Sequence, residues 1–148
     1  MKWIIEPKTY PAVAEVAFAA FRLFVGIFLV WGVWDNVVSA ERMAEFAAFL
    51  GNFGFPLPDL MAPLSVYAQL ICGIGFILGV LTRWVGLLCG INFIVALVMV
   101  DLQGGFRQAF PAAMLVMFGV YIAARGSGRF SVDAILGQRL SAKVSQSK

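Results

Sequence analysis

The sequence predicts an all-α integral membrane fold: a four-helix bundle with a short interfacial helix in the first outer loop and a short amphipathic helix in the tail. Hydrophobic residues make up 61% of the 148 residues and charged residues only 13%, about half the roughly 25% typical of soluble domains. The mean hydropathy is +0.90. Several charge-poor stretches are long enough to cross a bilayer. A chain of this length is expected to form one membrane domain, 1–148.

The first predicted transmembrane helix covers about 12–35, where only Glu15 and Arg22 interrupt the apolar run. The other three cover about 60–81, 84–101 and 107–124, because about 20 apolar residues span the hydrocarbon core. Continuous apolar runs favour helices over barrel strands, which would alternate polar and apolar residues. Glu6 and Pro7 break any signal-peptide pattern, so the first helix is expected to be retained.

Two further segments are expected to lie at the membrane surfaces. Segment 39–54 predicts a short helix in the outer interface, with Ser39 as its N-cap and Glu41 in its first turn. The alternative is an ordinary aromatic loop packed on the bundle. In the tail, 125–148, Ser131 is expected to cap a helix with one apolar face. The residues of that face are Val132, Ile135, Leu136 and Leu140.

Basic residues predict the orientation. Eight of the eleven lie at the amino end, in the second loop or in the tail, and only Arg42 and Arg107 lie in the first and third loops. The positive-inside rule then places both termini in the cytoplasm. The eight basic residues on the expected cytoplasmic side are Lys2, Lys8, Arg83, Arg125, Arg129, Arg139, Lys143 and Lys148. The net charge of +3 is explained by this topology, so no nucleic-acid partner is expected and the bilayer is the expected partner.

The composition also excludes several kinds of chemistry. The chain has no histidine and two cysteines, so it cannot build a His-ligated haem, a His-rich zinc site, a Ser-His-Asp triad or a four-cysteine iron-sulfur cluster. No metal and no tightly bound cofactor are expected. Any redox role must use a diffusible or partner-borne cofactor.

Glycines flank a tight hairpin expected around Thr82-Arg83. Gly75 with Gly79, and Gly86 with Gly90, are spaced so that helix backbones can approach closely. Counted outward from Arg83, Cys72 lies at about 16 Å and Cys89 at about 9 Å, a mismatch that disfavours a disulfide. We therefore interpret both thiols as packing residues.

Polar side chains within the membrane are the candidate functional groups. Counting 1.5 Å per residue places Arg22 near the level of Asn92. Arg22 is expected either to extend toward the inner headgroups near Glu15 or to face the interior and donate to Asn92 or a ligand carbonyl.

A second polar layer is expected at the outer rim. Arg107 is expected to form a structural ion pair with Asp35 or Asp101, or else these carboxylates accept protons at the mouth of a pocket lined by aromatic residues. That pocket would be lined by Trp31, Trp34 and Tyr67. Together the candidate ligand-binding residues are Arg22, Trp31, Trp34, Asp35, Tyr67, Gln69, Asn92, Asp101 and Arg107.

Three segments, FRLFVGIFLVWG (21–32), CGIGFILGVLTRWVGLL (72–88) and GSGRFSVDAIL (126–136), together resemble the DoxX family of small four-helix bacterial membrane proteins. The resemblance implies a four-helix bundle in the bacterial inner membrane and a role in quinone-linked redox work. Two positions depart from the family pattern. Family members often carry an acidic residue at the position of Gln69 and a lysine at that of Asp35, so any chemistry that uses those groups is lost or rearranged here.

The sequence suggests three functions. The leading hypothesis is a quinone-interacting subunit of a membrane redox system, with Arg22, Gln69 and Asn92 donating to quinone oxygens and electrons supplied by a redox partner. The alternative is a non-catalytic structural or assembly subunit of a larger respiratory or membrane complex, because no complete catalytic constellation is visible. A small-solute carrier is less favoured, since inverted repeats are not detectable.

Overall fold

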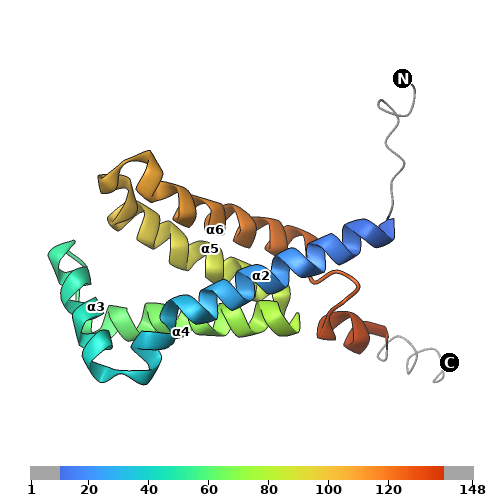
Figure 1. Ribbon diagram of the computed structural model, residues 1–148, viewed down its shortest axis with the longest axis horizontal. Helices are drawn as coiled ribbons and strands as arrows, with labels where there is room; N and C mark the ends of the chain where they lie inside the picture. The colour runs from blue at the N-terminus through green and yellow to red at the C-terminus, as the bar shows by residue number, and fades with distance from the viewer. Residues whose placement is uncertain (1–10, 139–148) are drawn as a thin grey trace.

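A computed structural model describes residues 11–138 of the protein (Figure 1). The predictions made for the amino end and for the last part of the tail therefore lie outside the described residues. One of them is that the amino end with Glu6 and Pro7 is retained. The others concern the basic residues and the apolar tail residue at positions Lys2, Lys8, Arg139, Leu140, Lys143 and Lys148.

The described residues form helices and no strand, which confirms the all-α prediction. Four helices are long and apolar enough to cross a membrane, in good agreement with the predicted spans. They are α2 (Pro11–Val38), α4 (Pro58–Leu78), α5 (Thr82–Met99) and α6 (Phe106–Arg125). A helix α3 (Ala40–Asn52) and a 3-10 helix η1 (Asp101–Gly104) lie in the loops, and residues 132–138 form a short helix in the tail.

The four long helices pack mainly as two pairs, α2 along α4 and α5 along α6 (Figure 1). Glycines lie at the closest approach within each pair. A Cβ added to Gly26 would lie 2.8 Å from the Gly73 carbonyl oxygen, and one added to Gly86 would lie 2.7 Å from that of Gly119. Small residues allow this approach where lipid offers no hydrophobic drive for association. Gly86 thus serves the α5–α6 contact.

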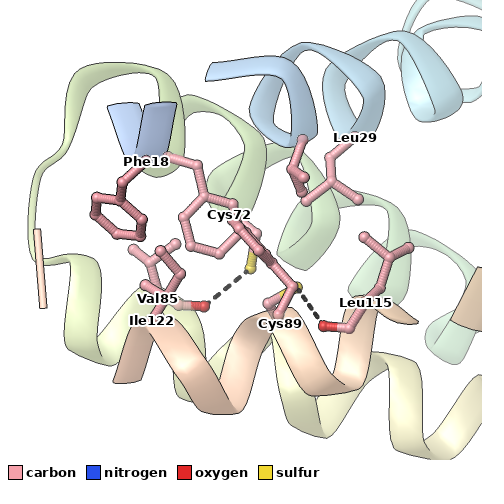
Figure 2. Close-up of a cluster of buried hydrophobic side chains, with 10 residues drawn as sticks. Phe18, Leu29, Cys72, Val85, Cys89, Leu115 and Ile122 are labelled. Carbon is pink, nitrogen blue, oxygen red and sulfur yellow. Dashed lines mark hydrogen bonds between the residues drawn. The ribbon is translucent and has the colours of Figure 1, made fainter. Parts of the chain in front are cut away.

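An apolar core joins the two pairs (Figure 2). Phe118 of α6 meets Phe21 of α2 and Phe76 of α4 edge-on, each at 5.1 Å between ring centroids. Leu29 and Ile122 are fully buried beside them. Edge-to-face aromatic pairs add about 0.5–1.5 kcal/mol to area burial. The core therefore holds the bundle together near the end where α2 begins and α6 ends.

Helix α3 crosses the opposite end of the bundle (Figure 1). The expected cap is confirmed: the Ser39 hydroxyl accepts a hydrogen bond from the Arg42 amide at 3.3 Å, with Glu41 in the first turn. Ala47 and Leu50 are buried against Ala62 of α4. The helical alternative is thus confirmed over the loop alternative, while its position in a membrane interface stays a prediction.

The α4–α5 turn lies from Gly79 to Leu81, somewhat earlier than the expected Thr82-Arg83. Gly79 has φ +69°, which glycine adopts without strain. Leu81 has φ 48°, in the left-handed region that side chains rarely adopt. The amides that begin α5 receive no cap from the Leu81 side chain.

Candidate functional site

A cleft of about 490 Å³ opens between α3, α4, α5 and the start of α6. It lies at the end of the bundle where the two helix pairs diverge in Figure 1. Its walls are mostly apolar, with rings from Phe46, Phe49, Phe55 and Phe93. This size and lining are typical of sites for small organic ligands.

Asn92 is a partly buried polar group of the cleft. Its Oδ1 accepts a hydrogen bond from the Ser65 hydroxyl at 3.0 Å, and both side chains are partly buried. This bond fixes the amide so that the carbonyl side faces α4. The Nδ2 donor has no partner among the described residues and lines the cleft. Asn92 therefore offers an oriented N–H donor inside an apolar cavity.

Two more of the expected residues line the cleft. Gln69 Nε2 donates to the Leu29 carbonyl at 3.5 Å, which directs its amide toward α2. Asp101 lies at the mouth in η1, and burial raises the pKa of its carboxyl even though the Gln108 side chain donates a hydrogen bond to it. The structure thus brings together Gln69, Asn92 and Asp101 of the expected set.

The expected aromatic pocket at the rim is wrong. Trp31 is 82% exposed, and Trp34 and Tyr67 are about half exposed; none of the three lines the cleft. The reason is helical phase, because the buried face of α2 runs through Val25, Leu29 and Val33. The two tryptophans therefore point away from the bundle.

The expected ion pair of Arg107 is also wrong. Asp35 and Arg107 are both exposed, and within the described chain Arg107 forms no ion pair with Asp35 or Asp101. Asp101 instead lines the cleft together with Gln108. Asp35 and Arg107 lie outside the cleft lining, so the structure does not join them to Asn92.

Arg22 lies far from Asn92, which corrects the expectation that they share one level. Its guanidinium packs against Gly79, at the α4–α5 turn. From Thr82 to Asn92 the helix rises about 15 Å further. The depth count failed because α2 extends well past the other helices at this end and crosses the bundle obliquely (Figure 1).

Arg22 binds the tail instead. It is 4% exposed, and it donates from Nη2 to the Phe130 carbonyl at 2.6 Å and from Nη1 to the Ser127 carbonyl at 3.3 Å. Asp133 supplies a compensating negative charge nearby. Buried charges need such partners, because desolvation alone costs several kcal/mol. The guanidinium therefore holds the segment after α6 against the bundle.

Asp133 supplies the cap that α5 lacks. Its carboxylate accepts from the Leu81 amide at 2.8 Å, the Thr82 amide at 3.0 Å and the Thr82 hydroxyl at 2.8 Å. Burial alone would raise the pKa of Asp133, but these bonds and the charge of Arg22 outweigh it and lower the pKa. The expected Ser131 cap of the tail helix is confirmed, since Ser131 Oγ accepts from the Ala134 amide at 3.1 Å.

Glu15 completes this network on α2. It accepts from Arg125 Nη2 at 2.5 Å and from the Arg129 amide at 3.0 Å. The Arg125 guanidinium also lies 3.9 Å from the centre of the Phe18 ring. The expected alternative of Arg22 beside Glu15 is therefore wrong, because Glu15 is paired with the end of α6. We call Glu15, Arg22, Thr82, Arg125 and Asp133 the polar latch.

The two thiols lie side by side, which corrects their expected mismatch in depth. The side chains of Cys72 and Cys89 are neighbours in the middle of the core (Figure 2). Both are free and fully buried. The expectation failed because the turn lies at Gly79–Leu81: measured from the helix ends that flank it, Cys72 is at about 9 Å and Cys89 at about 11 Å.

Comparison with known proteins identifies the family. Residues 9–102 match the family model described as DoxX, a range that includes α2, α3, α4 and α5 and therefore three of the four long helices. Neither a curated protein nor a solved structure gives a significant match. The matched range is more than half of the 148 residues. With four helices able to cross a bilayer, the chain is a multi-pass membrane protein that belongs to the DoxX family.

Proposed function

We propose that the cleft binds a quinone and that the protein is a quinone-interacting subunit of a membrane redox system. The observation that carries this proposal is the Asn92 amide, which is oriented by Ser65 and presents a free N–H donor inside an apolar cavity. A quinone ring is apolar on both faces and carries carbonyl oxygens at its edge. Such an oxygen is the acceptor that Asn92 Nδ2 lacks.

The lining of the cleft supports a neutral lipophilic ligand. It includes the Asp101 carboxylate and no lysine or arginine. An anionic headgroup would meet a like charge with no cation to balance it. Leu64, Ile91 and Val95 line the cleft and are also exposed on the outer surface of the helices. In a bilayer this surface faces acyl chains, so a ligand dissolved in lipid reaches the cleft directly.

Electrons for the quinone come from another protein in this proposal. The described residues hold no group of three or more metal-ligating side chains, and the chain has no histidine. We therefore assign the electron donor to a larger membrane complex or a redox partner. A purely structural subunit of such a complex would not need an oriented donor in a cleft, which is why the quinone role is preferred.

The distribution of arginines supports an orientation in the bacterial inner membrane. Arg83, Arg125 and Arg129 lie at the end of the bundle that carries the polar latch, and Arg42 and Arg107 lie at the cleft end. By the positive-inside rule the polar latch faces the cytoplasm. The cleft then opens near the outer leaflet.

A photoreactive azidoquinone with a short isoprenoid chain tests the proposal. The protein is reconstituted in lipid nanodiscs and illuminated, and the label is mapped by mass spectrometry. We expect labelling on α4 and α5, with competition by unlabelled quinone. Losing one amide donor removes about 0.5–1.5 kcal/mol, so Asn92→Leu should weaken binding about 2- to 12-fold.

Asn52→Leu is the matched control, because Asn52 is exposed at the end of α3 and does not line the cleft. It should bind as the wild type does. Labelling spread evenly over the outer helix faces, or equal affinities for the Asn92→Leu and Asn52→Leu variants, would contradict the proposal.

A further inference from the structure

The two buried thiols border the cleft through a shared layer of side chains. Cys72 follows Gln69 by one helical turn on α4, and Cys89 precedes Asn92 by one turn on α5. Leu88 and Phe93 belong to both regions, since they line the cleft and also pack against the core cluster that holds the cysteines. The dithiol therefore lies directly behind the wall against which a quinone would rest.

The thiols are also placed to react with each other. Cys72 Sγ lies 3.6 Å from the Val85 carbonyl oxygen, one turn before Cys89 on α5, so its side chain reaches across the α4–α5 contact. Cys89 Sγ lies 3.9 Å from the Leu115 carbonyl oxygen, and its side chain is a neighbour of that of Cys72 in the same core cluster. In the view of Figure 2 both sulfur atoms lie between α4, α5 and α6. Packing alone does not require two thiols in contact, since alanine or serine fills similar space.

We propose that Cys72 and Cys89 form a dithiol–disulfide couple that exchanges two electrons with the quinone bound in the cleft. This inference rests on the proposed function and names the electron carrier next to its site. In the step both S–H bonds break and one S–S bond forms between the two Sγ atoms. The quinone takes the electron pair and both protons on its oxygens and becomes a hydroquinone, so atoms and electrons balance.

The apolar wall controls this exchange. Both cysteines are fully buried, so a water-soluble oxidant reacts with them slowly. A lipophilic oxidant in the cleft is separated from them only by Leu88 and Phe93. Movement of these two side chains brings the quinone ring to the sulfur atoms. The couple is thereby selective for an oxidant that enters through the cleft.

The test uses full-length protein in nanodiscs, reduced and kept free of oxygen, with a short-chain quinone added. We expect one hydroquinone per protein, loss of two alkylatable thiols, and a linked pair of α4 and α5 peptides in the mass spectrum. Cys72→Ala and Cys89→Ala should each abolish hydroquinone formation while quinone photolabelling is unchanged. Asn92→Leu should slow thiol oxidation about 2- to 12-fold at low quinone concentration, in line with its weaker binding.

Phe93→Ala is the second variant, and it should speed oxidation because it opens the wall. Photolabelling in the cleft with both thiols still alkylatable would overturn the couple and leave the proposed function standing. Absence of cleft labelling would overturn both. Equal oxidation rates in the wild type and in Asn92→Leu would show that the oxidant does not act from the cleft, and would also overturn the inference.

Discussion

The two ends of the bundle are built in opposite ways. At the end with the polar latch, side chains from α2, α5 and α6 bond to one another and to the tail through charged groups at 2.5–3.3 Å. At the cleft end, the helix pairs diverge around a cavity of about 490 Å³, and Asn92 keeps one donor free. The difference teaches that the charged contacts are concentrated at one end, whereas the other end keeps an open cavity.

Breaking the polar latch at Arg22 is expected to have the largest effect. Arg22→Leu removes two charge-assisted hydrogen bonds, leaves the carbonyls of Ser127 and Phe130 unpaired and removes the partner charge of Asp133. Losing one partner of a buried charged network costs about 3–5 kcal/mol. Unfolding in detergent, with protease cleavage of the tail as a second readout, measures the loss.

Arg107→Leu serves as the control for that variant, because Arg107 is exposed at the cleft end. It should change the free energy of unfolding by less than about 0.5 kcal/mol. Similar losses in the two variants would show that the two ends contribute alike.

Asp133→Asn is expected to have the next largest effect, a loss of about 2 kcal/mol in the free energy of unfolding. The carboxylate accepts three hydrogen bonds, whereas the asparagine side chain is neutral and has one acceptor oxygen. The folded pKa of Asp133 lies below its ordinary value. Its contribution is therefore complete above the ordinary pKa of about 3.9 and is lost as pH falls through the lower folded pKa. Tail protection against protease, followed from neutral to acidic pH, should fall in this window in the wild type and stay flat in the variant.

A smaller effect is expected at the α5–α6 contact. A Cβ at Gly86 would lie 2.7 Å from the Gly119 carbonyl oxygen and 2.8 Å from the Ala123 amide nitrogen. Since both are backbone atoms, α5 and α6 must move apart, and Gly86→Ala should cost about 1–2 kcal/mol. Thermal unfolding in detergent measures this.

Gly90→Ala, one turn further along the same helix, is the matched control because a Cβ there meets nothing within 4 Å. It should be neutral or stabilise by up to about 1 kcal/mol, since alanine is the better helix former. A loss of stability in Gly90→Ala equal to that of Gly86→Ala would contradict the packing described for this contact.

The smallest effect is expected from Asp101 at the mouth of the cleft, and its sign is opposite to that of Asp133. Burial raises the folded pKa of Asp101, so its ionised form opposes folding at neutral pH. Asp101→Asn should stabilise by less than about 1 kcal/mol, a gain that appears as pH rises from about 3.9 through the raised folded pKa. Unfolding curves at several pH values would contradict this if the variant were less stable at neutral pH.

The spans were predictable because the bilayer constrains length and polarity at once. Residues 60–81 and 107–124 were expected to cross, and α4 and α6 differ from them by only a few residues at each end. The Ser39 and Ser131 caps were predictable for a local reason, since each serine bonds an amide three residues ahead.

The polar contacts were less predictable because they depend on partners far away in sequence. Arg22 donates a hydrogen bond to the Phe130 carbonyl, 108 positions later in the sequence. Counting depth along one helix also gives no information about the depth at which another helix begins. One signal could have located the Asp133 cap. A leucine side chain has no acceptor to cap α5, whereas Asp133 follows Gly126 and Gly128, whose positive φ angles let the chain turn back toward the bundle.

The cap supplied by Asp133 also fixes the order in which the protein can be completed. Asp133 lies 52 positions after Leu81, so the ribosome delivers α5, η1 and α6 before this carboxylate exists. During synthesis the first amides of α5 must rely on water or lipid headgroups at the membrane surface. The second and third transmembrane segments can thus insert early, but the turn between them reaches its final geometry only after the last segment has been translated.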